Sequence, residues 1–256
     1  MPVVRNEYPI LEYDTEKVGV ILPNRNGRAA LPKLCLMTFF REVLADFISK
    51  NPVVEVSSYN SEMGVFPIYK TMYKGFEICL VQAVVGSASA AMMADMLIGC
   101  GVTTLFACGG CGVFEEIPAG DVIIPVSALR DEGASYHYLP PSRDICLDVE
   151  VISSIEKTLI ELGTPYIEAK TWTTDAFYRE TPDMITYRKE EGCSVIEMEC
   201  ATLAAVAKFR GVKFGQLLYS GDILTDFANY DERAWADKLG AREKLFFLAL
   251  EALIRL

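Results

Sequence analysis

Short, almost wholly apolar runs alternate along this chain with longer segments in which apolar residues recur every three or four positions. The short runs predict β-strands at residues 18–22, 75–84, 103–108, 121–127, 165–173, 194–196 and 213–219. The longer segments predict helices at 34–49, 87–99, 147–162, 181–191, 199–210 and 230–256. Strands that alternate with helices are typical of βαβ units, so we expect a largely parallel sheet with helices on its faces.

The most apolar of these strands indicate a sheet that is covered on both sides. The run Val122-Ile123-Ile124-Pro125-Val126 has no polar position on either face. The 256 residues are 51% hydrophobic, and no Pro-, Gly- or Ser-rich linker or block of charge divides them. We therefore predict an α/β fold with three layers, and a single domain over residues 1–256.

The charge of the chain excludes some classes of partner. It carries 24 Lys and Arg residues against 35 Asp and Glu residues, for a formal net charge of −11. A surface that follows nucleic-acid phosphates needs clustered cations, so we expect no nucleic-acid partner. No apolar run approaches the ~20 residues of a membrane span, and the segment from Met1 to Tyr8 lacks the apolar core of a signal peptide. We expect a cytoplasmic protein without membrane association.

Carboxylates follow two of the predicted strands. Glu197 and Glu199 come directly after the run 194–196, and Asp222 follows the run 213–219. In open α/β sheets, ligands bind outside the carboxyl ends of the strands. We therefore predict that Glu199 and Asp222 face the same bound molecule.

Two further motifs each allow two interpretations. The helix start Gly86-Ser87-Ala88-Ser89 offers unpaired N–H groups to an anion, but its small residues could serve close packing alone. The pair Cys108 and Cys111 has the spacing of a redox dithiol, although the glycines around it favour a backbone turn. Most of the eight cysteines lie in apolar runs, which favours buried free thiols. The single histidine, His137, has no histidine partners for a metal cluster, so we expect no metal.

In their order along the chain, the motifs resemble those of the trimeric and hexameric nucleoside phosphorylases, a family that includes purine nucleoside phosphorylase, uridine phosphorylase and related purine-ribosyl hydrolases. The resemblance covers nearly the whole chain. Its segments are Val20-Ile21-Leu22-Pro23, Gly86-Ser87-Ala88-Ser89, Cys108-Gly109-Gly110-Cys111-Gly112, Ala119-Gly120-Asp121-Val122-Ile123-Ile124, Asp131-Glu132-Gly133-Ala134-Ser135-Tyr136-His137, Thr174-Asp175-Ala176-Phe177-Tyr178, Glu197-Met198-Glu199-Cys200-Ala201-Thr202 and Ser220-Gly221-Asp222. It implies a central mixed sheet that curls toward a barrel, and a homo-oligomer, a trimer or hexamer, built from dimers that share active sites.

The resemblance also assigns roles to single residues. It implies that the ribose is bound by Glu199 and Met198, with Tyr8 reaching the sugar of an adjacent subunit. It implies that Asp222 donates a proton toward the purine N7 with the help of Arg233, and an acid at this position favours purine over pyrimidine substrates. The base would contact Phe177, Tyr178, Ile196 and Gly110, and phosphate would contact Arg28, Arg25, Gly109 and Ser87.

The chain departs from the family at the phosphate site. Asn24-Arg25-Asn26 stands where the phosphorylases have Gly-Asp-Pro, and Ala107 stands where they have an arginine. One lost bidentate arginine weakens phosphate binding by about 1.5–3 kcal/mol. The expected function is phosphorolysis of purine, and secondarily pyrimidine, ribonucleosides to free base and ribose 1-phosphate, with phosphate as the co-substrate and no other cofactor. Hydrolysis by water, or nucleoside binding without turnover, is the alternative.

Overall fold

The computed structural model of the chain describes residues 3–24, 27, 30–225, 227, 230–235 and 238–256. Its strands are β1 (Val3–Val4), β2 (Tyr13–Asp14), β3 (Leu34–Thr38), β4 (Val54–Ser61), β5 (Gly64–Tyr73), β6 (Phe76–Gln82), β7 (Thr104–Val113), β8 (Val122–Asp131), β9 (Asp144–Cys146), β10 (Tyr166–Thr174), β11 (Cys193–Glu197) and β12 (Lys213–Ile223). Its α-helices are α1 (Arg41–Lys50), α2 (Ser87–Gly99), α3 (Val149–Glu161), α4 (Pro182–Glu190), α5 (Cys200–Arg210) and α6 (Leu239–Leu253), and short 3-10 helices lie at η1 (Pro9–Leu11), η2 (Ser135–His137) and η3 (Phe177–Arg179).

One large mixed sheet organises the fold. Its strand order is β11-β10-β8-β12-β7-β3-β6-β5-β4, with β9 paired to β8. Strand β11 also pairs with β7, through Val195 with Val113 and Ile196 with Gly112. This extra pairing closes β7, β12, β8, β10 and β11 into a barrel, while β3, β6, β5 and β4 continue as an open sheet. The predicted α/β fold with a barrel-like mixed sheet is confirmed.

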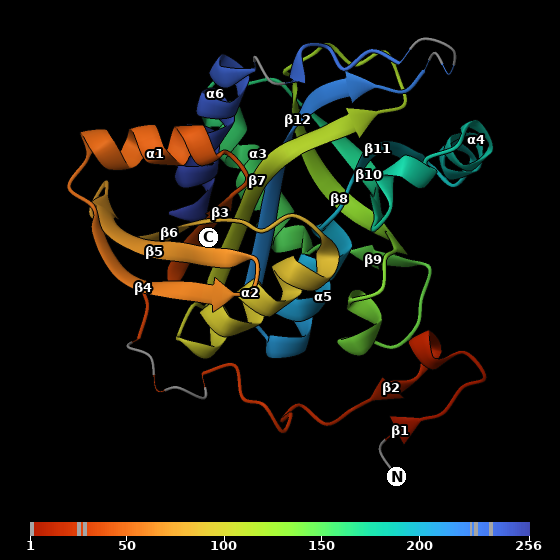
Figure 1. Cartoon of the computed structure of the whole chain (residues 1–256). Helices are drawn as coiled ribbons and strands as arrows, with labels where there is room; N and C mark the ends of the chain where they lie inside the picture. Colours follow the sequence, from red (N-terminus) through yellow and green to blue (C-terminus); the bar gives the residue numbers. More distant parts are fainter. Residues whose placement is uncertain (1–2, 25–26, 28–29, 226, 228–229, 236–237) are drawn as a thin grey trace.

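Helices cover both faces of the sheet (Figure 1). On one face, α1, α3 and α6 share a hydrophobic core with Leu36, Phe106 and Leu217 of the sheet. On the other face, α2 and α5 pack against Met37 and Leu105. A smaller cluster around Leu218 and Val113 fills the closed part of the sheet. Burial on both faces explains why the strands are apolar at successive positions.

Helix ends follow the local sequence. The side chain of Asp148 accepts from the N–H of Glu150 at the start of α3. Thr181 caps α4 in the same way, and Pro182 occupies its first turn, where a missing N–H costs no helical hydrogen bond. Helix α5 ends at Gly211, whose φ of +74° is easily adopted only without a side chain.

Three sequence predictions of secondary structure were wrong. The segment 34–49, predicted as one helix, is strand β3 followed by α1, because a short apolar run does not distinguish a buried strand from a buried helix. The segment 18–22 is not a strand, and Val20 is fully exposed, so its apolar side chains do not belong to the core. The helix predicted over 230–256 begins only at Leu239. No helix within the described residues has the length and apolarity needed to cross a bilayer.

Candidate active site

A cavity of about 800 Å³ lies at the carboxyl ends of the barrel strands, and Glu199 and Asp222 both line it. The two acids come from different strand ends, β11 and β12, that the closed sheet brings to one side. The structure therefore places the predicted pair at one cavity. Met198, Phe177, Tyr178, Ile196, Gly109 and Gly110, which the sequence also selected, line the same cavity.

Glu199 is held at the first turn of α5. Its Oε1 accepts a hydrogen bond of 2.5 Å from the amide of Gly86, which precedes α2. The residue is only 6% exposed. Burial, followed by the charge of Glu197, raises the pKa of Glu199 to about 8. Hydrogen-bond donors of a ligand would favour the ionised form of Glu199.

Glu197 has a different part in the structure. Its Oε2 accepts from the backbone N–H of Glu199 at 2.7 Å and of Cys200 at 2.6 Å. Its Oε1 accepts from the hydroxyl of Thr173 at 2.6 Å. These bonds satisfy donors at the start of α5 and tie the helix to β10, so Glu197 shapes the turn that presents Glu199.

Ser87 is turned into the protein. It is 1% exposed, does not line the cavity, and its hydroxyl donates to the carbonyl of Met198 at 2.6 Å. This bond joins the start of α2 to the turn between β11 and α5. The predicted contact of Ser87 with phosphate has no support in this arrangement.

Asp222 lies near the end of β12, within the irregular stretch between Ser220 and Ile223 where the pairing of β12 with β7 shifts. The hydroxyl of Tyr230 donates to its Oδ2 at 3.0 Å. Burial raises the pKa of Asp222, while the bond from Tyr230 and the charge of Arg233 oppose that rise. A carboxyl group with a raised pKa can hold a proton for donation to a base.

Arg233 is near Asp222 but outside the cavity lining. Its guanidinium Nη1 donates to the carbonyl of Ile117 at 2.7 Å, and its backbone has a φ of +48°. It lies before α6, in the segment wrongly predicted as helix. The charge of Arg233 therefore lowers the pKa of Asp222. A role of Arg233 in proton transfer stays a prediction.

Close packing against Trp235 explains why position 221 is a glycine. A Cβ placed there would come within 1.9 Å of the indole of Trp235, and one at Gly110 within 2.5 Å of the same ring. The indole also packs on Tyr219, with ring centroids 5.5 Å apart. Trp235, which lines the cavity, was missed because the sequence placed it within a long helix.

The aromatic pair Phe177 and Tyr178 forms an open side of the cavity. Their ring centroids are 4.0 Å apart, and the side chains are 51% and 88% exposed. Ile196, by contrast, lies on strand β11 and is buried. Exposed aromatic rings and a buried aliphatic side chain that line one cavity can hold a flat heterocycle.

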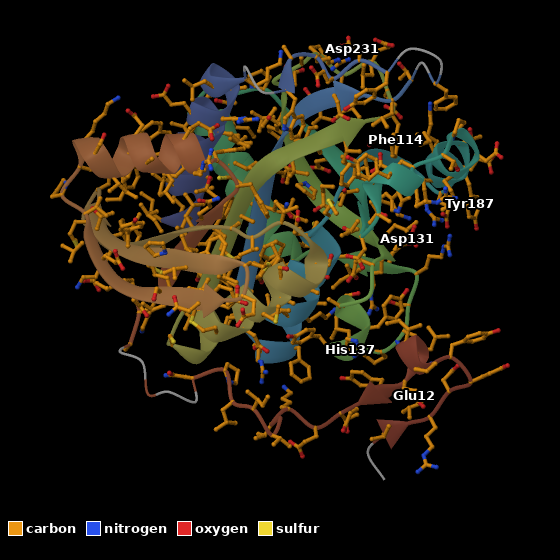
Figure 2. All side chains as sticks on the ribbon, in the orientation of Figure 1. Glu12, Phe114, Asp131, His137, Tyr187 and Asp231 are labelled. Carbon is orange, nitrogen blue, oxygen red and sulfur yellow. The ribbon has the colours of Figure 1, made fainter. Side chains whose placement is uncertain are left out.

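Tyr8 lies away from the cavity within the single chain. It is 62% exposed, and it precedes η1, which contacts η2. His137 of η2 shares a surface groove with Ile10, and Figure 2 shows it at the end of the molecule opposite to Asp231. A contact of Tyr8 with the site of an adjacent subunit stays a prediction.

The predicted contacts of Arg25 and Arg28 with phosphate stay predictions. Arg25 and Arg28 lie outside the described residues, but the neighbouring Pro23 and Asn24 pack against the position of Gly99, at the end of α2 far from Gly86. A 13-residue helix is about 20 Å long, so Pro23 and Asn24 lie about that far from Gly86. The loop that follows the first strand of the large sheet contains Phe39 and Phe40, and both line the cavity.

Acidic residues outnumber cationic residues in the described lining of the cavity. The acidic residues are Glu180, Glu197, Glu199, Asp222 and Glu232, whereas Arg242 is the one cationic residue among the described lining residues. The guanidinium of Arg242 is bound to Glu42 at 2.6 Å, to the carbonyl of Trp235 at 2.8 Å and to the hydroxyl of Tyr219 at 3.2 Å. Its charge is thus largely balanced by Glu42.

The cysteine pair has the properties of core residues. Cys108 is completely buried, and Cys111 is 2% exposed; both are free thiols. Burial raises the pKa of Cys108 to about 12, and burial together with nearby acids raises the pKa of Cys111. Because thiol exchange needs an accessible thiolate, the arrangement does not support the redox interpretation.

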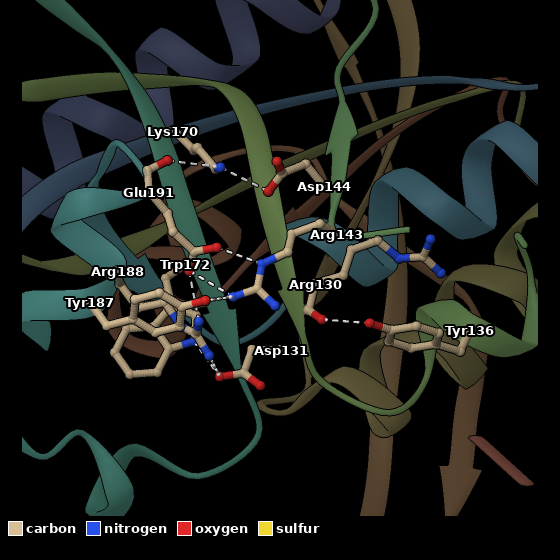
Figure 3. A network of polar contacts seen from close by, with 10 residues as sticks. All are labelled: Arg130, Asp131, Tyr136, Arg143, Asp144, Lys170, Trp172, Tyr187, Arg188 and Glu191. Atoms are coloured by element: carbon tan, nitrogen blue, oxygen red, sulfur yellow. Dashed lines mark hydrogen bonds and ion pairs between the residues drawn. The ribbon is translucent and has the colours of Figure 1, made fainter. Parts of the chain in front are cut away.

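A polar network joins α4 to the strands β8 and β10 (Figure 3). Arg188 of α4 pairs with Glu191 at 2.7 Å and with Asp131 of β8 at 2.9 Å. Asp131 also accepts from the indole N–H of Trp172 at 2.9 Å. The network fixes α4, which directly follows η3, against the barrel.

Comparisons with known proteins agree with this geometry. The sequence profile of the Phosphorylase superfamily matches residues 33–255, starting one residue before β3. The chain is 27% identical over 157 residues to the guanosine phosphorylase of Halorubrum lacusprofundi, a match that covers 59% of this chain and 64% of that protein. It is 26% identical over 205 residues to the purine nucleoside phosphorylase of Plasmodium vivax, covering 78% of this chain and 81% of that protein.

Two solved structures show the same fold. The AMP nucleosidase of Bacteroides thetaiotaomicron superposes with a TM-score of 0.70 at 25% identity, over 88% of each chain. The uridine phosphorylase of Vibrio fischeri superposes with a TM-score of 0.74 at 19% identity, over 92% of this chain and 95% of that chain. The profile match spans most of the sequence, and the chain belongs to the Phosphorylase superfamily.

Proposed function

We propose that this protein cleaves the N-glycosidic bond of purine ribonucleosides. The observation that carries the proposal is that Glu199 and Asp222 line one cavity together with the aromatic rings of Phe177 and Tyr178. The names of the relatives, which include guanosine and purine nucleoside phosphorylases and an AMP nucleosidase, support a nucleoside as substrate.

The two acids suit the charges that develop in this reaction. As the bond breaks, positive charge grows on the ribose and negative charge grows on the departing base. In the proposal, ionised Glu199 accepts hydrogen bonds from the ribose hydroxyls and stabilises the sugar cation. Protonated Asp222 donates to the purine N7, so the base leaves as a neutral molecule. The raised pKa of Asp222 supports this assignment.

For the acceptor, the charge of the cavity favours water over phosphate. A phosphate dianion needs several charge-assisted donors to leave water. The described lining has five acidic residues and only Arg242 as a cation, and Arg242 is paired with Glu42. Phosphorolysis stays the second candidate, because the relatives include enzymes named as phosphorylases.

Turnover of inosine and of uridine with and without phosphate tests both candidates. Hydrolysis gives free base and free ribose at a rate that phosphate does not change, whereas phosphorolysis gives ribose 1-phosphate and stops without phosphate. Faster cleavage of inosine than of uridine would support the purine preference. Nucleoside binding without turnover under any condition would show a degenerate member and contradict the proposal.

The expected assembly and cellular role also remain proposals. We propose a homo-oligomer, trimeric or hexameric, in which the segment around Tyr8 contacts a neighbouring copy, and a part in purine salvage in the cytoplasm. Light scattering after size-exclusion chromatography measures the assembly, and a monomer at all concentrations would contradict it.

A further inference from the structure

Arg242 of α6 joins three segments beside the cavity. Its Nη1 donates to Oε1 of Glu42 on α1 at 2.6 Å, its Nη2 donates to the carbonyl of Trp235 at 2.8 Å, and its Nε donates to the hydroxyl of Tyr219 at 3.2 Å. A guanidinium has five N–H groups, so two of those of Arg242 have no partner among the described residues. Arg242 lines the cavity, and its side chain is 15% exposed. A ligand in the cavity can therefore reach this group.

The rings that Arg242 holds also border the base-directed acid. The indole of Trp235 packs on the ring of Tyr219, with centroids 5.5 Å apart. The same indole covers the position of Gly221, the residue before Asp222. The charge of Arg242 therefore acts on the part of the cavity that Asp222 lines.

Glu42 balances that charge from outside the cavity. It is not among the described lining residues, and its side chain is 43% exposed in the first turn of α1. Burial alone would raise the pKa of Glu42, but the hydrogen bond and the charge of Arg242 lower that pKa below its ordinary value. Glu42 is therefore ionised at neutral pH, and the pair has no net charge. Since Arg242 is the one cation among the described lining residues, this pairing decides whether the cavity attracts an anion.

Resting on the proposed function, we propose that Glu42 is a specificity-determining residue that keeps anions out of the cavity by neutralising Arg242. The anions concerned carry phosphate oxygens, either as inorganic phosphate or as the 5′-phosphate of a nucleotide. With Glu42 in place, a phosphate group at Arg242 competes with a carboxylate that is already bound at 2.6 Å. A neutral nucleoside meets no such competition. The pair thus selects nucleosides over nucleotides, and water over phosphate as the acceptor.

The test replaces Glu42 by glutamine, which keeps the size of the side chain and removes its charge. Glu161→Gln is the matched control, because Glu161 pairs with Arg255 at the same distance of 2.6 Å and neither residue lines the cavity. A double variant carries Glu42→Gln together with Arg242→Gln. Calorimetry of each full chain at constant ionic strength measures the affinity for inorganic phosphate. Kinetics compare the KM of inosine 5′-monophosphate with that of inosine.

We expect Glu42→Gln to bind phosphate about 10- to 100-fold more tightly than the wild type, because a charge-assisted donor becomes available. If the anion takes the place of the acceptor, this variant also forms ribose 1-phosphate. If it takes the place of a 5′ group, the KM of inosine 5′-monophosphate falls about 10-fold relative to that of inosine. Either result supports the role of Glu42 and distinguishes the two sources of phosphate.

The control and the double variant make the test specific. Glu161→Gln should bind phosphate as the wild type does, and the double variant should lose the gain in affinity. A loss of packing alone would not raise the affinity for an anion. The proposal is overturned by unchanged behaviour of Glu42→Gln toward both anions, by an equal gain in Glu161→Gln, or by a gain that persists without Arg242.

Failure of this inference differs from failure of the proposed function. If the wild type cleaves inosine and Glu42→Gln shows no gain, only the role of Glu42 is overturned. If the wild type cleaves inosine only with phosphate, phosphate enters with Glu42 in place, so the role of Glu42 and water as the acceptor are both wrong, while bond cleavage stands. If no protein releases the base, bond cleavage is overturned, and calorimetry with phosphate still decides the role of Glu42.

Discussion

The amide of Gly86 donates a hydrogen bond of 2.5 Å to Oε1 of Glu199, and so joins the residue before α2 to the first turn of α5. The two residues are 113 positions apart in the sequence. The bond fixes one oxygen of the carboxyl group and leaves the other for a ligand. Because Glu199 is buried beside Glu197, its charge is costly until a ligand donates to it.

The first prediction concerns stability and pH. The pKa of Glu199 is raised to about 8 from an ordinary value of 4.5, so the folded state prefers the protonated form. Protonated Glu199 contributes its full share of the folding stability below its ordinary pKa. That share is lost as pH rises through the folded pKa, here between about pH 5 and 8. Glu199→Gln lacks this loss. As pH rises over that range, the melting temperature of the variant should therefore increase relative to that of the wild type. Melting temperatures that change with pH in the same way in both proteins would contradict the raised pKa of Glu199.

The same substitution should weaken the sugar contact. Glu199→Gln replaces charge-assisted hydrogen bonds by neutral ones, which is worth roughly 1.5–3 kcal/mol, or about 10- to 100-fold in nucleoside affinity. Calorimetry at pH 8 measures this loss. Wild-type binding at pH 7 should also release protons, since the ribose hydroxyls favour the ionised form of Glu199, and equal heats in buffers of different ionisation enthalpy would argue against it.

Asp222→Asn should lower kcat for inosine by about 10²- to 10⁴-fold, because asparagine has no proton to give to the base. A substrate whose base leaves without protonation, such as a nitrophenyl riboside, should be cleaved nearly as fast as by the wild type. Asp183→Asn, an exposed change on α4 outside the cavity lining, is the control. Equal loss with both substrates would show that the position serves structure and not proton donation.

Tyr230→Phe should move the alkaline side of the activity profile. The hydroxyl of Tyr230 donates to Asp222 and lowers its pKa, so its removal raises that pKa further. Activity that depends on protonated Asp222 is lost as pH rises through this pKa. The profile of kcat against pH should therefore extend to higher pH in the variant, and a shift to lower pH would reverse the assigned sign.

Gly221→Ala should disturb the cavity through Trp235. A Cβ at this position would overlap the indole, so the ring must move. We expect a loss of about 1–3 kcal/mol of unfolding free energy and a changed tryptophan emission, with a higher KM. Gly240→Ala is the control, because nothing lies within 4 Å of a Cβ there. An unchanged emission spectrum in Gly221→Ala would contradict the contact.

Arg188→Ala tests the network that fixes α4. Arg188 is 5% exposed, and its loss leaves Asp131 and Glu191 with fewer partners, so unfolding should become easier by about 2–4 kcal/mol. Lys50→Ala removes an exposed pair with Asp46 and should leave the unfolding free energy almost unchanged. Urea titrations of both variants measure the difference. Equal costs would show that the burial of the network does not matter.

Local pattern predicted the helices that the structure confirms. The bounds of α2 agree with the predicted 87–99, and those of α3, α4 and α5 differ from the prediction by at most two residues at either end. The pattern also placed Glu199 and Asp222 at strand ends. These features depend on the order of side chains within one segment, where apolar spacing, caps and strand ends are set by neighbours in the sequence.

The sequence by itself thus determined the α/β class, the alternation of most strands and helices, and the acids at two strand ends. The tertiary structure alone decided that β11 closes onto β7, that Phe39 and Phe40 line the cavity, and that Trp235 covers Gly221. Glu180, Gln216 and Arg242 had no local signal as lining residues. Their positions follow from pairings and packing between segments far apart in the chain, which no single stretch of sequence encodes.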